Sequence, residues 1–251
     1  MKFDHPQKPQ ISQLRSLWKE AFGDTEEFLD IFFSTAFSPN RCRCAAEDGQ
    51  VLAALYWFDV SCAGQKLAYI YAVATGKASR GRGLCRALMA DSAEILRSAS
   101  YQGALLVPQS EGLFAMYGKM GYLPATLLEE FHCAASEPLP VREIRPEEYA
   151  ALRPALLPPD SVIQEGENLL FLGKIARFYK GDGFLAAVSR EAEHLRILEY
   201  LGDSGKIASL IAALGHREAT VRTPGGMQPF SMYLPLDDRC PRPAYFAFCF
   251  D

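Results

Sequence analysis

The stretch from Tyr69 to Gly83 constrains the fold of this chain more than any other feature of its sequence. A β-rich apolar run breaks at Gly76, continues as a basic loop with alternating glycines, and passes directly into residues with helical spacing. A strand, a loop and the start of a helix are therefore expected to meet at one place. Such a junction offers unpaired backbone N–H groups and the positive end of a helix dipole, which together favour binding of a phosphate group.

The loop carries positive charge that the chain as a whole lacks. The 251 residues have a formal net charge of -4, with 49% hydrophobic and 22% charged residues. This composition is typical of globular proteins of one large or two small domains, and the acidic balance argues against a nucleic-acid partner. No apolar run forms a signal core or is long enough to cross a bilayer, so we expect a cytoplasmic protein without a membrane partner. The basic residues of the loop region are Lys77, Arg80, Arg82 and Arg86.

The cysteines indicate neither a disulfide framework nor a metal site. There are seven, an odd number at irregular positions, and several lie among apolar residues, as buried thiols do. Cys42 and Cys44 are separated by a single residue, which is too tight for the usual spacing of zinc ligands. We therefore expect no metal cofactor.

Apolar spacing predicts a defined order of elements in the first half of the chain. Aromatic residues recur at helical spacing after Thr25, which predicts a helix with an aromatic face that begins at this N-cap. Alternating patterns before the loop predict three antiparallel strands. The predicted ranges are helices at 11–20 and between Thr25 and Pro39, strands at 41–46, 51–60 and 66–75, a helix at 84–96, a strand at 103–107, a helix at 113–120 and a strand at 126–133.

Other phosphate-binding loops fit this sequence less well than one that holds coenzyme A (CoA). The dinucleotide fingerprint needs glycine or alanine at position 86, where Arg86 stands, and the chain has no Gly-Lys-Ser/Thr phosphate loop. Glycine at positions 81 and 83 lets the backbone approach a pyrophosphate closely. A single glycine motif is weak evidence for a ligand, so a basic turn that binds no ligand remains the alternative interpretation of this loop.

Two motifs in the right order carry a resemblance to the GNAT superfamily of N-acetyltransferases, over residues 11 to 135. The segment 79–84, Ser-Arg-Gly-Arg-Gly-Leu, is similar to the acetyl-CoA loop of that family, although Ala78 stands where the family pattern begins with Gln or Arg. Tyr117, Gly121 and Tyr122 match the family's signature of tyrosine, three residues, glycine and an aromatic residue. The Ser-Glu-Gly lead-in at 110–112 most resembles the enhanced-intracellular-survival type of acetyltransferase.

The resemblance implies which residues would contact acetyl-CoA and which would act on it. Tyr117 would be the general acid that protonates the CoA sulfur, and Ser110 lies where the family often has Asn against the pantetheine. Backbone N–H groups near the end of the strand would hold the pantetheine and the thioester carbonyl. The implied acetyl-CoA contacts are Val73, Ala74, Thr75, Ser79, Arg80, Gly81, Arg82, Gly83, Leu84 and Ser110.

The general base is not identified by the sequence. Acetyl transfer requires an amine that has lost its proton, and the strand at 66–75 contains no carboxylate that could accept this proton. Several groups remain as alternatives, and each of them also fits a purely structural role. They are Tyr69, Tyr71, Asp59, Glu111 and the terminal carboxylate of Asp251.

The sequence of the second half predicts that this part of the chain forms a degenerate copy of the same fold. After a linker at 134–140, the predicted order of hairpin, helix and strands repeats the later part of the first half. The equivalent of the glycine loop, 202–206, is acidic and too short to hold a pyrophosphate, so this half would shape the acceptor pocket instead. The predicted elements are a helix from Pro146, a hairpin of strands 183–189 and 194–201 around a turn at 191–193, a helix at 205–214, and strands at 218–223, 230–234 and 245–250.

We therefore expect an α/β (α+β) protein with tandem GNAT-like domains at 1–137 and 138–251, each a mixed, mostly antiparallel sheet flanked by helices. The expected activity is transfer of an acetyl group from acetyl-CoA to a primary amine of a small molecule or peptide. The sequence does not select the acceptor among an aminoglycoside-like amine, a polyamine, an amino acid and a protein amine. A homo-oligomeric state also remains open. Two alternatives remain: an acetyl-CoA-binding regulatory module without turnover, and a non-catalytic interaction protein.

Overall fold

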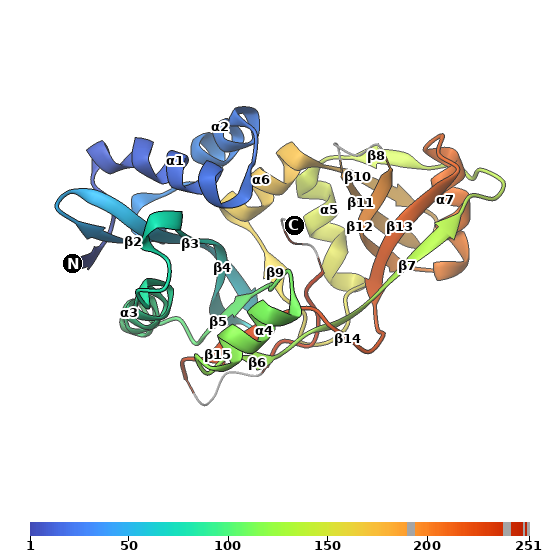
Figure 1. The fold of residues 1–251 in the computed structure, drawn as a ribbon. Helices are drawn as coiled ribbons and strands as arrows, with labels where there is room; N and C mark the ends of the chain where they lie inside the picture. The colour runs from blue at the N-terminus through green and yellow to red at the C-terminus, as the bar shows by residue number, and fades with distance from the viewer. Residues whose placement is uncertain (190–193, 238–241, 248, 250–251) are drawn as a thin grey trace. The chain divides into compact units, whose positions relative to one another are not determined.

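The computed structural model describes residues 1–189, 194–237, 242–247 and 249 (Figure 1). The chain forms two compact units, and each unit contains segments that are distant in the sequence. The first unit comprises Met1–Leu106, Ser110–Leu123 and Tyr233–Cys240, and the second comprises Val107–Gln109, Pro124–Met232 and Pro241–Asp251.

From α1 to α4 the first unit has the predicted order of helices and strands, whereas β1, which precedes α1, was not predicted. Gly23, with φ of 77°, ends the first helix, and the Thr25 side chain caps the second by accepting a hydrogen bond of 3.2 Å from the Phe28 N–H. The elements are β1 (Lys2–Asp4), α1 (Ile11–Phe22), α2 (Glu26–Thr35), β2 (Cys42–Glu47), β3 (Gln50–Cys62), β4 (Gln65–Thr75), the short 3₁₀ helix η3 (Lys77–Ser79), α3 (Leu84–Ser98), β5 (Gly103–Leu106), α4 (Glu111–Gly118), β6 (Leu123–Pro124) and β15 (Met232–Pro235).

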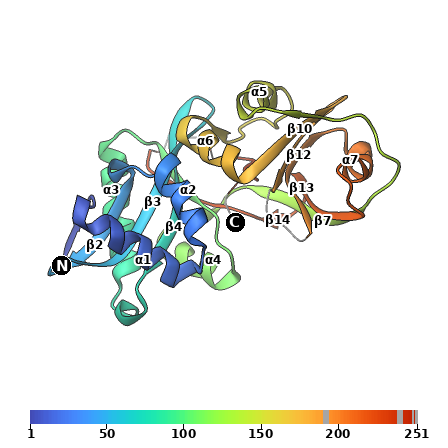
Figure 2. The ribbon, with the colours of Figure 1, turned by 90° about the horizontal axis from the view of Figure 1, so that it is seen from above.

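The first sheet has the strand order β1-β2-β3-β4-β5-β15-β6. Neighbouring strands from β1 to β4 are antiparallel, whereas β4 and β5 are parallel, as expected for strands joined by the crossing helix α3. Helices α1 and α2 cover one face of this sheet and α3 covers the other (Figures 1 and 2). The aromatic face predicted for α2 is part of the core, because the Trp18 ring centroid lies 4.5 Å from that of Phe32 and 5.1 Å from that of Tyr56.

The second unit repeats this arrangement. Its sheet has the order β14-β7-β13-β12-β11-β10-β8, in which β10, β11 and β12 are antiparallel neighbours and β12 is parallel to β13 across helix α7. The elements are β7 (Leu127–Ala134), β8 (Arg142–Ile144), α5 (Pro146–Leu152), β9 (Ile163–Gln164), α6 (Gly166–Ile175), β10 (Ala176–Gly181), β11 (Phe184–Ser189), β12 (Leu195–Gly202), α7 (Ile207–Ala213), β13 (Glu218–Pro224) and β14 (Gln228–Pro229).

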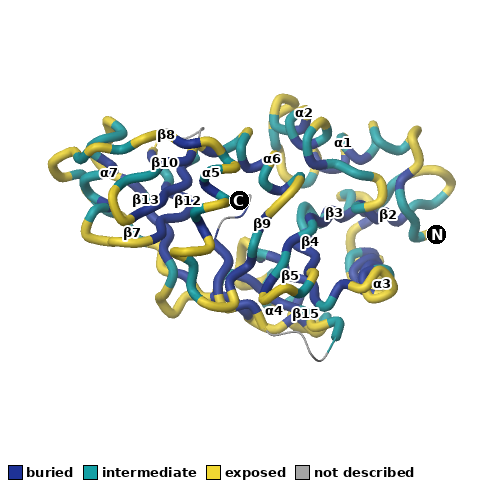
Figure 3. The backbone as a smooth tube through the Cα atoms, turned by 180° about the vertical axis from the view of Figure 1, so that it is seen from behind, coloured by how far each residue is buried: buried dark blue, intermediate teal, exposed yellow. Residues whose placement is uncertain are grey.

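The predicted fold class is therefore confirmed: two mixed, mostly antiparallel sheets, each flanked by helices. Buried residues gather along the central strands of each sheet, and exposed residues occupy the outer faces of the helices and the turns (Figure 3). In the second unit, Ile207, Leu210 and Ile211 of α7 pack on the sheet in one cluster with Phe184 and Tyr200. The turn predicted at 191–193 lies outside the described residues.

Each sheet contains a strand whose position the sequence pattern did not indicate. β7 pairs with β13 in the second sheet, with Phe131 opposite Val221, whereas the predicted boundary after residue 137 assigns this strand to the first domain. β15 lies between β5 and β6 in the first sheet, although in sequence it follows β14 of the second sheet. Alternating apolar residues predict that a strand exists, but they do not identify the strand with which it pairs.

For the described residues, the prediction of a buried strand at 245–250 is right about burial and wrong about the strand. The described residues between Tyr245 and Cys249 are buried, as predicted. They do not form the predicted strand, since Tyr245 makes only an isolated parallel bridge to Ser161. An apolar run of this length indicates burial, but it does not by itself distinguish a strand from an irregular buried segment.

Candidate functional site

The predicted loop joins the end of β4 to the start of α3, and its first residues are held by hydrogen bonds. The Gly76 N–H donates to the carbonyl oxygen of Leu52 in β3 at 2.9 Å, and the Lys77 N–H donates to Oε1 of Glu20 in α1 at 2.6 Å. The Ser79 N–H donates to the Gly76 carbonyl at 2.8 Å, which closes the 3₁₀ turn. The base of the loop is therefore fixed to both a strand and a helix.

Gly81 and Gly83 both adopt the left-handed backbone conformation, with φ of 78° and 76°. A Cβ atom at either position would meet nothing within 4 Å, so the space around both glycines is open. Backbone conformation, and not crowding, is the reason for glycine here. The open side of the loop lies at the N-terminus of α3, where backbone N–H groups have no partner within the helix.

The basic side chains of the loop, Lys77, Arg80, Arg82 and Arg86, are all exposed. Arg80 donates through Nε to the Thr75 carbonyl at 3.3 Å, and Arg82 donates through Nη2 to Oε2 of Glu47 at 3.0 Å. Arg86, in the first turn of α3, is exposed. Ser79, in contrast, is buried, so any contact it makes with a ligand would come through its backbone.

β4 and β5 separate beside the loop. Their parallel pairing covers only residues 67–69 and 103–105, and β4 extends beyond it to Thr75. Ala72 has a φ of 48°, and the register with β3 shifts at this place, so β4 carries a bulge in its second half. Of the predicted contact residues here, Val73 and Thr75 are half-buried and Ala74 is buried.

Tyr117 lies in α4, which begins at the N-cap Ser110. The Ser110 side chain accepts a hydrogen bond of 3.3 Å from the Leu113 N–H, so this serine fixes the start of the helix that carries the tyrosine. Burial raises the pKa of Tyr117, and Cys85 in the first turn of α3 raises it further. Within the described part of the chain, no group forms a hydrogen bond with the Tyr117 hydroxyl.

The predicted candidates for the general base lie in different surroundings. Asp59 accepts a hydrogen bond from the Tyr101 hydroxyl and lies 3.8 Å from Nη1 of Arg41, so a structural role accounts for it. The Tyr69 ring stacks with that of Phe58, with 5.9 Å between the centroids, and the Tyr71 ring lies tilted to it at 5.7 Å. Glu111 is exposed at the start of α4, and Asp251 lies outside the described residues.

The corresponding loop of the second unit is closed by its own side chains. Asp203 accepts a hydrogen bond of 3.0 Å from the Gly205 N–H, and Lys206 pairs with Asp182 at 3.1 Å. The end of β12 is covered as well, because Leu201 packs in a buried cluster with Tyr245. The described residues of this unit offer no counterpart of the open glycine loop.

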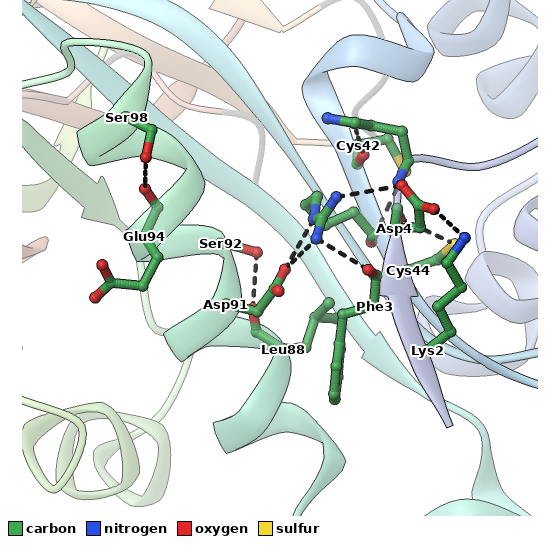
Figure 4. Close-up of polar contacts among 12 residues, drawn as sticks. Lys2, Phe3, Asp4, Cys42, Cys44, Leu88, Asp91, Ser92, Glu94 and Ser98 are labelled. Carbon is green, nitrogen blue, oxygen red and sulfur yellow. Dashed lines mark hydrogen bonds and ion pairs between the residues drawn. The ribbon is translucent and has the colours of Figure 1, made fainter.

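Arg43 is a buried residue of the first unit that the sequence interpretation did not single out. Its Nε and Nη2 atoms donate to Oδ2 of Asp91 in α3 at 2.8 and 2.6 Å, and Nη2 also donates to the Phe3 carbonyl at 3.1 Å. Nη1 of Arg43 also lies 3.7 Å from Oδ1 of Asp4, and Figure 4 shows Asp91, Phe3 and Asp4 around these contacts. An arginine inside an otherwise apolar strand was the available signal, since a buried charge requires a partner. The pair fixes α3, and with it the loop, to β1 and β2.

The described residues contain neither a candidate metal site nor a helix that could span a membrane. No group of three or more His, Cys, Asp and Glu side chains there could hold a metal ion. No helix in the same ranges has both the length and the apolar character needed to span a bilayer. The described cysteines are all free, and Cys42, Cys44, Cys62 and Cys249 are buried.

Comparison with known proteins gives one family match and several similar structures. Residues 2–125 match the family described as acetyltransferase (GNAT) domain. No curated protein matches the chain.

The similar structures cover nearly the whole chain at low identity. A GCN5-related N-acetyltransferase from Anabaena variabilis is 15% identical with a TM-score of 0.72, over 94% of this chain and 73% of that one. Eis1 from Mycobacterium abscessus is 11% identical with a TM-score of 0.67, over 94% and 74%. A tandem GNAT protein from the clavulanic acid biosynthesis pathway is 13% identical with a TM-score of 0.58, over 95% and 99%. These likenesses show the tandem fold.

Proposed function

We propose, from the premise that residues 2–125 are an acetyltransferase domain of the GNAT family, that this protein transfers the acetyl group of acetyl-CoA to a primary amine. The domain match supports an acyltransferase. The donor, the acceptor and the roles of single residues are part of the proposal. The observation that carries it is the glycine loop of the matched domain, whose backbone is open at Gly81 and Gly83 at the N-terminus of α3.

The residues of the loop fit a CoA molecule. CoA carries a pyrophosphate and a ribose phosphate, and the loop offers exposed guanidinium groups next to backbone that is open at Gly81 and Gly83. The N-terminus of α3 adds a partial positive charge at the same place. Arg80, Arg82 and Arg86 would therefore hold the phosphate groups.

The end of β4 would hold the acetyl-pantetheine part. Because β4 extends beyond its pairing with β5, backbone groups of Val73 to Thr75 are available on that side for an extended ligand. Hydrogen-bond donors there would polarise the thioester carbonyl, the group at which negative charge develops. Ser110 and Leu84 would line the same ligand.

Tyr117 would act as the general acid toward the CoA sulfur. A raised pKa keeps the phenol protonated at neutral pH, and its hydroxyl has no partner among the described residues that would compete for the proton. The incoming amine must lose a proton, and the described part of the first unit does not single out a side chain for this step. An amine that arrives unprotonated from solvent would need no such base.

The second unit would then serve the acceptor and not the cofactor. Its loop is closed by Asp203 and Lys206, which argues against a second CoA. The Ser-Glu-Gly lead-in and the likeness to Eis1 support placing the protein with the enhanced-intracellular-survival type, as part of the proposal.

A panel of amines assayed for CoA release tests this function. The panel includes an aminoglycoside, a polyamine, free amino acids and lysine peptides, each with acetyl-CoA, and calorimetry measures CoA binding separately. Release that depends on an amine, with a mass gain of one acetyl group on that amine, supports the proposal. CoA binding without any reactive amine favours a regulatory module without turnover, and absence of CoA binding contradicts both.

A further inference from the structure

Arg82 differs from the other basic side chains of the loop because a carboxylate of the same chain is already its partner. Its Nη2 atom lies 3.0 Å from Oε2 of Glu47. The side chains of Lys77, Arg80 and Arg86 form no ion pair with any residue that the structure describes. The loop therefore has one arginine that a bound phosphate would have to share or displace.

The backbone position of Glu47 is set by the β2–β3 hairpin. Glu47 is the last residue of β2 and pairs with Gln50 across the hairpin that leads into β3. Oε1 of the same carboxylate lies 3.8 Å from the Met1 amino group. The Arg82 side chain is 44% exposed and that of Glu47 is 40% exposed, so solvent reaches the pair and the arginine is free to change partners.

We propose that Glu47 competes with the phosphate groups of CoA for Arg82 and so sets the affinity of the loop for acetyl-CoA. This inference rests on the proposed function. A guanidinium binds an anion most strongly when two of its N–H groups donate to that anion together. When Arg82 donates to a phosphate group in this way, it loses its contact with Glu47. The Arg82 hydrogen bond and charge hold the pKa of Glu47 below its usual value, so the carboxylate is ionised at neutral pH.

The effect should be small, local and sensitive to salt. Exposed pairs of this type contribute little, so Glu47→Gln should tighten CoA binding by about two- to fivefold at low ionic strength. Since exposed charges are screened by salt, the gain should shrink toward zero as the ionic strength approaches about 1 M. Glutamine keeps the size of the side chain and its place in β2 while it removes the charge.

The test is calorimetric titration of CoA into the protein and four variants. Glu47→Gln is compared with Glu94→Gln, which removes a carboxylate that pairs with Arg97 within α3 at 2.5 Å and is 74% exposed, against 40% for Glu47. Arg82→Ala and the double variant Arg82→Ala with Glu47→Gln complete a double-mutant cycle, which isolates the coupling between the two side chains. Circular dichroism confirms that each variant is folded.

The outcomes separate the inference from the proposed function. Tighter binding by Glu47→Gln, no change in Glu94→Gln, and loss of the gain in the Arg82→Ala background support the inference. CoA binding that Glu47→Gln leaves unchanged or weakens, or that Glu94→Gln tightens equally, overturns the inference while the proposed function stands. No CoA binding by any of the proteins overturns the proposed function and the inference with it.

Discussion

The Tyr117 ring meets the Tyr122 ring edge-on, with 5.9 Å between the ring centroids. Gly121, with φ of 94°, turns the chain back after α4, and the Tyr122 N–H donates to the Tyr117 carbonyl at 3.2 Å. The motif of tyrosine, three residues, glycine and an aromatic residue is thus a structural unit that places two phenols side by side. Only one of them is proposed to act on the substrate, so the pair provides its own control.

Tyr117→Phe should lower kcat by about 10²- to 10⁴-fold, the usual contribution of a general acid, with little change in CoA affinity. The aromatic ring is retained, so the contact with Tyr122 and the packing of α4 should persist. Steady-state kinetics with the best amine and CoA calorimetry give the two quantities. Tyr122→Phe, which removes a hydroxyl from the fully buried neighbour, should leave kcat within a few-fold of wild type. Equal losses in the two variants would contradict the assignment.

The pH profile of kcat/KM should have no alkaline limb that arises from Tyr117 within the accessible range. Burial, with a smaller effect of Cys85, raises the pKa of Tyr117, so the phenol stays protonated even above the ordinary tyrosine value of about 10. The rate should rise with pH as the acceptor amine loses its proton and then stay level. A fall in kcat/KM between about pH 8 and pH 10 that is reversed on return to neutral pH would argue against a protonated Tyr117 as the acid.

Gly81→Ala should weaken CoA binding and lower the free energy of unfolding by about 1 kcal/mol, because alanine is strained at positive φ. Gly118→Ala is the matched control, since a Cβ atom at either glycine meets nothing within 4 Å but only Gly81 has a positive φ. In the helix α4, alanine at position 118 should be neutral or slightly stabilising. Calorimetry and urea unfolding measure both effects. Identical behaviour of the two variants would show that backbone conformation at Gly81 does not matter.

The sequence predicted local backbone conformations well because their signals are short-range. The end of α1 at Gly23, the cap at Thr25 and the glycines at 81 and 83 depend on the conformation of single residues, which the residue type reports directly. The roles proposed for Tyr117 came from a motif and remain predictions.

Long-range partners could not be predicted in the same way. Arg43 with Asp91, Arg82 with Glu47, and Arg153 with Glu199 are each separated by 35 residues or more, and nothing in the local pattern selects these pairs. The same limit applies to β7 and β15, because a strand's alternation reports its faces but not its neighbours.

Neither residues 1–137 nor residues 138–251 should fold as an independent monomer. The first fragment lacks β15, which lies between β5 and β6, and the second lacks β7, which pairs along the whole of β13. Each would expose the edge of an unfinished sheet, which favours aggregation. Separate expression, co-expression and size-exclusion chromatography test this. Co-expression of the two fragments should recover a complex with the elution volume of the intact chain, whereas two soluble, folded fragments would contradict the prediction.

Glu199→Gln should destabilise the second unit strongly, because it leaves a buried guanidinium without its counter-charge. Arg153 donates through Nε and Nη2 to the two Glu199 oxygens at 2.7 and 2.8 Å, and the Tyr149 hydroxyl donates to the same carboxylate at 2.7 Å. Both members of the ion pair are buried, with side-chain exposures of 5% and 0%. Breaking a buried pair from one side costs about 3–5 kcal/mol in the free energy of unfolding.

Glu148→Gln is the matched control, since Glu148 pairs with Arg142 at 2.5 Å on the surface of the same unit, with side-chain exposures of 36% and 62%. Urea unfolding should show a large fall in the midpoint for Glu199→Gln and almost none for Glu148→Gln, because solvent replaces the lost partner only at the surface. Combining Arg153→Met with Glu199→Gln should recover part of the loss by removing the stranded charge. Equal midpoints for Glu199→Gln and Glu148→Gln would mean that water reaches the Arg153 guanidinium, which contradicts its burial.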